Sequence, residues 1–199
     1  MNIHAKKPVR RVVLARPKYS EYRDDLKLDF NGACGYCDDN DSRVDSVCFH
    51  IDHFAPKSRF PHLQNDYANL VYACRFCNQR KSGHWIGNDA TIPHDGQKGF
   101  IDPCSNEYDQ NIERDSYGRI KGKTELGRYI VRRLNLNLIR HELLWNARRA
   151  RFLRDVIPTL TERHEAAGLP NNAIYTELLK RYMELTKKIE SYELCAING

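Results

Sequence analysis

The chain has 199 residues, of which 41% are apolar and 29% charged, close to the averages of globular proteins. This balance excludes disordered and collagen-like proteins, and the length suits one compact domain or two small modules. The longest stretch without charge, residues 166–176, contains Gly and Pro and is shorter than the roughly 18 apolar residues of a membrane span. Because the apolar run at residues 12–15 is too short for a signal peptide, we expect a cytoplasmic protein.

The formal net charge of +6 is distributed unevenly along the chain. Residues 1–33 sum to +4, residues 34–104 to −2 and residues 105–199 to +4. The segment from Arg119 to Arg154 holds eleven Lys or Arg against two Glu, a charge that attracts polyanions. Nucleic acid is the partner that this segment predicts, and a solvated helix face is the alternative.

The predicted elements begin with a short helix over residues 19–30, where apolar residues recur every three or four positions. Asn31 and Gly32 are expected to end this helix. Runs of β-branched and aromatic residues predict two strands, at residues 47–54 and 69–73, with a loop that contains proline between them.

The chain after the second strand is predicted to change from loop to helix. Residues 78–82 are expected to open a helix, and the glycine-rich segment 83–99 is expected to be a loop. From residue 124 onward apolar residues recur with a helical period, and Asn137 is expected to cap a second helix that buries Phe152.

A third helix is predicted to follow Pro170, with Asn171 or Asn172 as its cap. Apolar residues recur along one side of it down to about residue 192. This side is expected to be buried, and it consists of Ile174, Leu178, Leu179, Tyr182, Leu185 and Ile189.

Four of the seven cysteines form two C-x-x-C pairs, Cys34/Cys37 and Cys74/Cys77. In a chain that is not exported, this pattern favours a metal site over disulfides. Two such pairs supply four thiolates for a tetrahedral Zn²⁺, which is structural because no coordination position stays open. The remaining cysteines are expected to act as small apolar residues, and they are Cys48, Cys104 and Cys195.

Residues between and after the cysteine pairs carry a second motif. His50-Ile-Asp-His-Phe-Ala-Pro-Lys57 is followed by Asn69-Leu70, and the second pair continues as Cys74-Arg-Phe-Cys-Asn-Gln-Arg-Lys81. In this order they resemble the HNH endonucleases, whose ββα-metal fold places Asp-His at a strand end and His or Asn at a helix start. The resemblance covers residues 34–82. It implies an α+β protein with a zinc-knuckled ββα-metal (HNH) nuclease core and a mostly helical C-terminal half.

The resemblance also implies a role for each residue of this motif. His53 is the general base that deprotonates water, and Asn69 orients its ring. Asp52 and Asn78 hold a catalytic Mg²⁺ or Mn²⁺ through oxygen atoms, in addition to the structural Zn²⁺. Because the last position is Asn78, the chain has the HNN form of the motif. His50 shares a strand face with Asp52 and is either an extra ligand or an ordinary strand histidine.

Two basic residues follow Asn78 on the predicted helix. Lys81 and Arg80 are expected to contact nucleic-acid phosphate, with solvation as the alternative. The expected organisation is therefore a basic N-terminal arm with a lead-in helix (1–33), the nuclease core with structural zinc (34–104), and a basic helical region that binds nucleic acid or a partner (105–199).

Three further segments resemble an HNH subgroup of bacterial antiphage operons: residues 51–58, Phe100-Ile-Asp-Pro-Cys104 and Arg133-Leu-Asn-Leu-Asn137. The nuclease subunit of Septu-type systems is the most similar type, and it implies an ATPase partner. The sequence thus predicts a metal-dependent endonuclease of antiphage defence, with DNA favoured as its substrate over RNA. The alternative is a zinc-stabilised nucleic-acid-binding module without catalysis.

Overall fold

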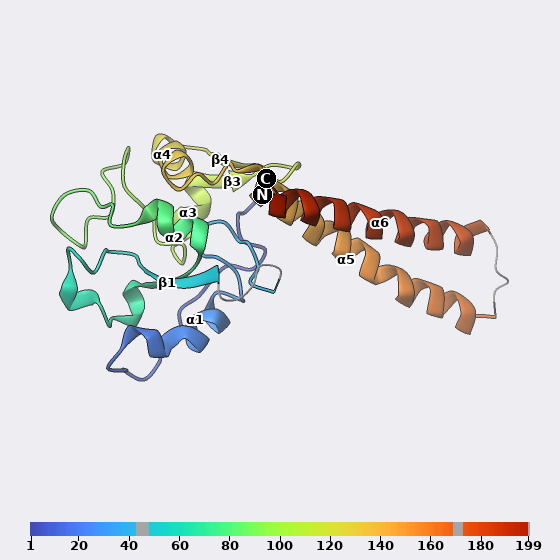
Figure 1. Ribbon diagram of the computed structural model, residues 1–199, viewed down its shortest axis with the longest axis horizontal. Coiled ribbons are helices and arrows are strands. Elements are labelled where there is room, and N and C mark those ends of the chain that lie inside the picture. The colour runs from blue at the N-terminus through green and yellow to red at the C-terminus, as the bar shows by residue number, and fades with distance from the viewer. Residues whose placement is uncertain (43–47, 169–172, 199) are drawn as a thin grey trace. The chain divides into compact units, whose positions relative to one another are not determined.

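The computed structural model describes residues 1–42, 48–168 and 173–198 (Figure 1). The chain divides into two compact units, residues 1–138 and 139–199. The first unit mixes short helices with small sheets, and the second consists of two long helices. Among the described residues, no helix combines the length and the apolar character needed to cross a membrane.

The first unit begins with an extended arm, a 3-10 turn η1 (Tyr19–Tyr22) and the helix α1 (Arg23–Asp29). Together they confirm the predicted lead-in helix. Asn31 and Gly32 have positive φ angles of 56° and 66°, a conformation that ends a helix. The predicted stop signal is therefore confirmed as well.

Both predicted strands are present and pair with each other. β1 (Phe49–His53) and β2 (Leu70–Cys74) are antiparallel, with the first residue of β1 opposite the last residue of β2. Val47, at the start of the first predicted strand, lies outside the described residues. Two 3-10 turns occupy the connecting loop, η3 (Pro61–Leu63) and η4 (Tyr67–Asn69).

Helix α2 (Arg75–Lys81) follows β2 without a loop. It begins three residues before the predicted start at residue 78, because Cys74 already acts as the N-cap: its sulfur accepts the N–H of Cys77 at 3.5 Å. Asn78 therefore lies within the helix, not at its start. In segment 83–99 the structure has neither helix nor strand, which confirms the predicted loop.

Four elements complete the first unit. Helix α3 (Asn106–Asn111) and the antiparallel hairpin of β3 (Ile112–Arg114) and β4 (Ile120–Gly122) have no counterpart among the predicted elements. Helix α4 (Glu125–Leu134) lies where helical periodicity predicts it, and the side chain of Thr124 caps its first turn.

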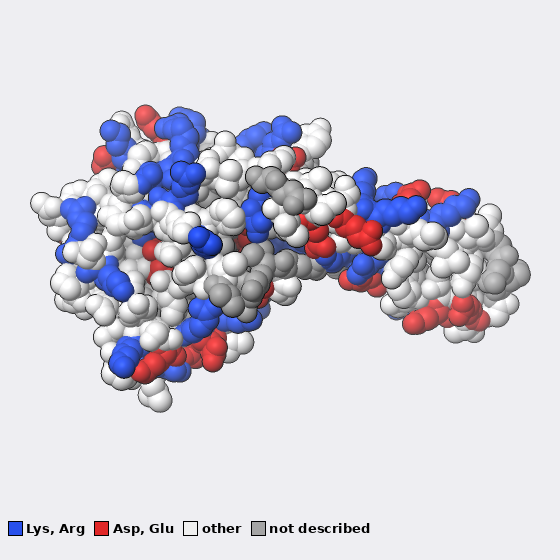
Figure 2. Space-filling model, in the orientation of Figure 1, with Lys and Arg blue, Asp and Glu red and all other residues white. Residues whose placement is uncertain are grey.

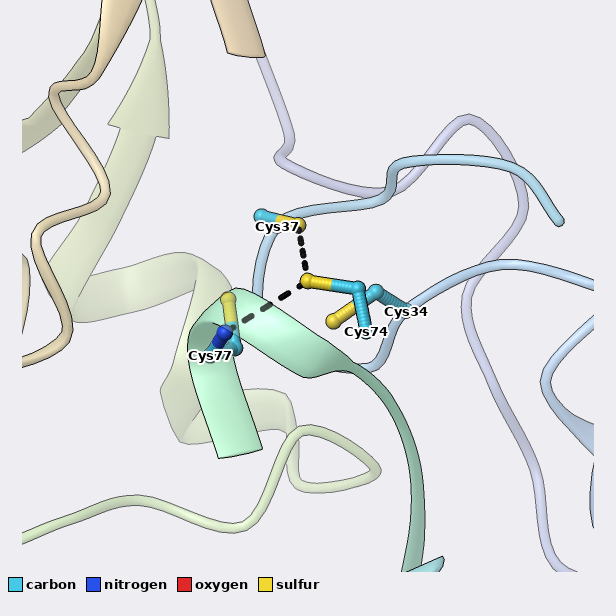
Figure 3. Close-up of side chains that lie close together, drawn as sticks. All are labelled: Cys34, Cys37, Cys74 and Cys77. Carbon is cyan, nitrogen blue, oxygen red and sulfur yellow. Dashed lines mark hydrogen bonds between the residues drawn. The ribbon is translucent and has the colours of Figure 1, made fainter. Parts of the chain in front are cut away.

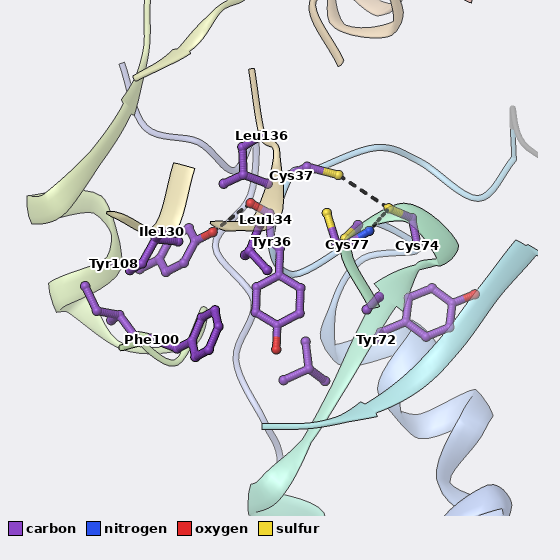
Figure 4. Close-up of a cluster of buried hydrophobic side chains, with 14 of the residues drawn as sticks. Tyr36, Cys37, Tyr72, Cys74, Cys77, Phe100, Tyr108, Ile130, Leu134 and Leu136 are labelled. Carbon is purple, nitrogen blue, oxygen red and sulfur yellow. Dashed lines mark hydrogen bonds between the residues drawn. The ribbon is translucent and has the colours of Figure 1, made fainter. Parts of the chain in front are cut away.

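One buried cluster joins these elements across the predicted domain boundaries (Figure 4). Leu26 of α1, Tyr72 of β2 and Ile130 of α4 all belong to it. The boundaries expected at residues 33 and 104 therefore do not separate compact units, because the lead-in helix and residues 105–138 share the core of the cysteine pairs.

The second unit consists of α5 (Ile139–Ala166) and α6 (Ala173–Asn198), which pack side by side (Figure 1). Helix α5 begins two residues after Asn137, so Leu138 and not Asn137 occupies the cap position. Phe152 is 73% exposed, which contradicts its predicted burial. The side that packs on α6 passes instead through Ala150 and Ile157.

Helix α6 confirms the third predicted helix and extends it to residue 198. Leu185 and Ile189 are buried, and Leu178 packs against them, as predicted. Ile174, Leu179 and Tyr182 are exposed, so half of the predicted buried side is wrong. The predicted cap residues, Asn171 and Asn172, lie outside the described residues.

Candidate functional site

Four buried cysteine side chains converge between the loop after α1 and the junction of β2 with α2 (Figure 3). The sulfurs of Cys34, Cys37, Cys74 and Cys77 all lie within 4.8 Å of one another. A tetrahedral Zn²⁺ with Zn–S bonds of about 2.3 Å has sulfurs about 3.8 Å apart, and Cys37 Sγ lies 3.8 Å from Cys74 Sγ. The predicted cysteine set is therefore brought together in a geometry that fits structural zinc.

The first cysteine pair sits in a tight turn that the backbone fixes. Asp38 donates its N–H to the carbonyl of Cys34, and Gly35 donates to the carbonyl of Tyr72, both at 2.8 Å. Burial raises the pKa of the Cys37 thiol well above its usual value. At Cys34 burial is outweighed by hydrogen bonds from the other three thiols, which instead lower its pKa well below the usual value. A zinc ion would supply positive charge to all four thiolates.

Three residues of the predicted catalytic set line one open pocket of about 410 Å³. Asp52 and His53 are the last two residues of β1, and α2 brings Asn78 to the opposite wall. The junction of β2 with α2 has no loop, so the strand pair fixes where the helix lies. Because α2 follows β2 directly, these side chains from the strand end and the helix lie around the same pocket.

Asp52 is buried, and two side chains hold its carboxylate. Oδ2 accepts the hydroxyl of Tyr36 at 2.6 Å and lies 3.0 Å from Nζ of Lys81. Burial raises the pKa of Asp52, and the charge of Lys81 opposes that rise. Among the described residues, Oδ1 has only one longer hydrogen bond, from Lys81 Nζ at 3.4 Å, so it keeps lone pairs for another ligand.

Asn78 is the second oxygen donor of the pocket. It is half-buried, and its amide makes no hydrogen bond to any residue that the structure describes. One carboxylate oxygen and one amide oxygen, facing an open pocket, form a donor set that suits Mg²⁺ or Mn²⁺. The residues present therefore fit the predicted catalytic ion.

The ring of His53 is held in one orientation by a backbone carbonyl. Its Nε2 lies 2.9 Å from the carbonyl oxygen of Gln64, and since a carbonyl only accepts, Nε2 is the donor. In the neutral ring Nδ1 then carries the lone pair. Burial and the charges of Lys57 and Lys81 lower the pKa of His53 below its ordinary value near 6.5, so the ring is neutral at pH 7.

Asn69 is buried and fixes the loop that follows β1. Its amide nitrogen donates to the carbonyls of Ala55 (3.0 Å) and Leu63 (3.2 Å), and its oxygen accepts the N–H of Ala55 at 2.7 Å. Within the described structure it makes no hydrogen bond to the ring of His53. Any effect of Asn69 on that ring passes through the loop, which also carries Gln64.

His50 stays outside this arrangement. It is exposed on β1 opposite Ala73, and it is not among the residues that line the pocket with Asp52. The structure thus gives His50 the place of an ordinary strand histidine.

The structure adds contacts that the sequence motifs do not announce. The ring of Tyr19 meets the ring of His53 edge-on, with centroids 4.7 Å apart. Tyr36, inside the first C-x-x-C pair, carries the hydroxyl bound to Asp52, and burial raises its pKa well above the ordinary value. Lys57 was part of the quoted motif and lines the pocket. Its position in the sequence, four residues after His53, could have indicated that it lies at the pocket.

The comparisons with known proteins agree with this geometry. The family model for HNH endonuclease matches residues 34–83, a span that contains both cysteine pairs and the pocket residues of β1 and α2. Residues 34–83 form an HNH domain. The Septu protein PtuB of Bacillus thuringiensis is 31% identical over 110 residues, which cover 54% of this chain and 37% of that protein. The chain therefore matches little more than a third of this relative. No solved structure matches the chain.

One predicted contact of the HNH domain is wrong. Lys81 was expected to reach nucleic-acid phosphate or solvent, but its side chain is fully buried. Its ammonium donates to the carbonyl of His53 at 2.7 Å and pairs with Asp52. Because Lys81 lies three residues after Asn78, α2 directs both toward the strand end. Arg80 is exposed, so its predicted phosphate contact stays a prediction.

Replacing Lys81 by methionine is expected to destabilise the fold by about 3–5 kcal/mol, because it leaves the carboxylate of Asp52 buried without its cation. Arg80→Met, one position earlier on α2, is the matched control and should change the free energy of unfolding by less than about 0.5 kcal/mol. Urea unfolding followed by circular dichroism measures both. Equal stability of the two variants would contradict a structural role for the buried pair.

Proposed function

We propose that this chain is a metal-dependent endonuclease that hydrolyses phosphodiester bonds in nucleic acid, with DNA favoured and RNA second. The observation that carries the proposal is that Asp52, His53 and Asn78 line the same pocket. A general base and two oxygen donors for a divalent ion are the groups that phosphodiester hydrolysis needs. Their convergence within an HNH domain supports catalysis over mere binding.

In the proposed reaction, Nδ1 of His53 accepts a proton from a water molecule. The water oxygen bonds to phosphorus, the bond from phosphorus to the 3′ oxygen breaks, and the 3′ oxygen takes a proton from solvent while His53 later releases its own to solvent. The products carry 5′-phosphate and 3′-hydroxyl ends, a polarity taken from the family resemblance. Asp52 and Asn78 would hold the Mg²⁺ or Mn²⁺. When bound, this ion supplies positive charge beside the phosphate and the leaving oxygen.

Unpaired arginines near the HNH domain support a polyanionic substrate. Arg80, Arg128, Arg132 and Arg133 make no ion pair with any residue that the structure describes, and Figure 2 shows basic side chains gathered over α4. Burial and the charge of Arg80 lower the pKa of Arg133, which indicates that two like charges lie close together. Phosphate contacts do not distinguish the sugars, so RNA remains the second candidate.

The similarity to a Septu protein supports a place in antiphage defence. We propose an ATPase partner that controls the nuclease, as the resemblance to Septu-type systems implies. A zinc-thiolate site needs reduced cysteines, and all seven cysteines are free, which supports a cytoplasmic location.

Cleavage of plasmid DNA and of total cellular RNA tests the proposal. Wild-type chain, alone and together with an ATPase encoded beside it, is expected to cut one polymer with Mg²⁺ or Mn²⁺ and to stop when EDTA is added. Excess Mg²⁺ must restore cleavage, and circular dichroism in EDTA must show an intact fold, because EDTA also competes for zinc. Binding without cleavage under every condition would favour the zinc-stabilised binding module.

A further inference from the structure

Lys57 places a charged group at the mouth of the pocket. It lines the pocket together with Asp52, His53 and Asn78, and its side chain is exposed. It makes no ion pair with an acidic group in the described parts of the chain. Among the described residues that line this pocket, Lys57 is the one Lys or Arg, and the ammonium of Lys81, buried nearby, is already paired with Asp52.

An aromatic side chain holds this ammonium in place. Lys57 Nζ lies 4.4 Å from the ring centroid of Tyr19 and donates a hydrogen bond to its hydroxyl at 3.1 Å. A cation above an aromatic face is attracted by the ring, and a hydrogen bond adds direction. A lysine that is already ordered loses less side-chain freedom when it binds an anion than a free lysine does.

Tyr19 in turn is fixed from two sides. Its backbone N–H donates to the side-chain oxygen of Asn65 at 2.9 Å, and the amide of Asn65 donates to the carbonyl of Pro17 at 2.8 Å. Its ring also contacts the ring of His53 edge-on. Tyr19 thus contacts both His53, the proposed base, and Lys57, the cation of the pocket.

The neighbouring cation shows the contrast. Arg59, two residues further along the same loop, donates to the carbonyls of Trp85 and Gly87 and to the side chain of Asn88. Its guanidinium is committed to the loop after α2. Among the described residues, Lys57 has only the neutral Tyr19 as a partner, so its charge stays available for a ligand.

We propose that Lys57, held by Tyr19, binds a backbone phosphate of the nucleic acid at the mouth of the HNH pocket. The inference rests on the proposed function, because it takes the pocket as the place where a phosphodiester lies. Tyr19 is a positioning residue, since it acts through Lys57 and His53.

The salt dependence of binding tests the phosphate contact. Affinity for labelled duplex DNA and for single-stranded RNA is measured over a series of salt concentrations without added Mg²⁺ or Mn²⁺, so that cleavage does not occur and the zinc site stays intact. Each phosphate contact on B-DNA contributes about 0.9 to the slope of log K against log salt concentration, and about 0.7 on single strands. Lys57→Met is expected to weaken binding and to reduce the slope by about one contact. Lys57→Arg keeps the charge and should keep the slope.

Lys98→Met is the matched control, because Lys98 is exposed but does not line the pocket. It should bind with the wild-type slope. Tyr19→Ala should keep the slope and weaken binding, whereas Tyr19→Phe, which retains the ring, should bind nearly as well as wild type. A wild-type slope for Lys57→Met, or no binding of either polymer by wild type, would overturn the contact. Wild-type affinity in Tyr19→Ala would overturn the restraint by Tyr19.

These outcomes are distinguishable from failure of the proposed nuclease activity. If Lys57→Met reduces the slope but wild type never cleaves, the phosphate contact is supported and the proposed catalysis is contradicted. If wild type cleaves but Lys57→Met keeps the wild-type slope, the catalysis is supported and the phosphate contact is contradicted. Circular dichroism of each variant, compared with wild type, confirms that the fold is intact.

Discussion

Replacing His53 by alanine is expected to reduce the rate of nucleic-acid cleavage by about 10²–10⁴-fold, the usual contribution of a positioned general base. The reason lies in the ring itself. Gln64 fixes Nε2 as a donor, and burial keeps the ring neutral, so Nδ1 is the proton acceptor of the pocket. The turnover number should fall while KM and nucleic-acid affinity stay close to wild type, because the base acts on water and not on the polymer.

His50→Ala is the matched control for this prediction. His50 lies on the same strand, three residues before His53, but it is exposed and does not line the pocket. Its replacement should leave cleavage unchanged. Single-turnover cleavage of the polymer that wild type cuts measures both variants, and thermal unfolding confirms their folds. A His53→Ala enzyme that cleaves at the wild-type rate would remove the base from the mechanism.

The sequence was sufficient for the parts of the site whose spacing is local. Each C-x-x-C pair lies within a single turn, and Asp52 and His53 are neighbours on one strand. Residues this close in the sequence are also close in space, so the sequence is enough to place them together. The antiparallel strands and the helix that follows directly then bring Asn78 to them. The family model and the cysteine cluster confirm the predicted fold class on these residues.

The direction of Lys81 could not be read from the sequence in the same way. A lysine in a basic run usually faces solvent, and only the position of α2 against the end of β1 turns Lys81 inward. The helix starts three residues earlier than predicted, but with either start the spacing of three residues places Asn78 and Lys81 on the same side of it. The error in the role of Lys81 came from the orientation of α2 against β1, which the sequence does not give.

Contacts between segments far apart in the chain were also beyond the sequence. Tyr19 precedes His53 by 34 residues, and its aromatic ring was assigned to a lead-in helix by periodicity alone. Phe152 was assigned to the core for the same reason, although the side of α5 that packs on α6 passes through Ala150 and Ile157. Periodicity identifies a helix well, but its burial depends on which neighbour it meets.

Cys74→Ser is expected to unfold the first unit. Serine has nearly the same shape as cysteine but is a poor zinc ligand, and structural zinc contributes on the order of 10 kcal/mol to the folding of small zinc modules. A typical domain has only about 5–15 kcal/mol of stability in total. Serine can still cap α2 in place of Cys74, which also serves as its N-cap, so the expected loss of stability comes from the zinc ion and not from the cap.

The same change should reach the pocket through the first cysteine pair. Tyr36 lies between Cys34 and Cys37, and its hydroxyl donates to Asp52. When the zinc site opens, this hydroxyl no longer has a fixed position beside the carboxylate. Loss of zinc is therefore expected to abolish cleavage together with the fold, whereas His53→Ala abolishes cleavage alone.

Cys195→Ser is the control, because Cys195 is exposed on α6 and belongs to the second unit. It should keep the wild-type zinc content and melting temperature. Elemental analysis of the purified variants gives the zinc content, and circular dichroism follows unfolding of both. If Cys74→Ser folded as stably as Cys195→Ser, the structural zinc site would be contradicted. In the proposal the zinc ion bound by the four thiolates stabilises the fold, so the loss of one ligand must lower the stability.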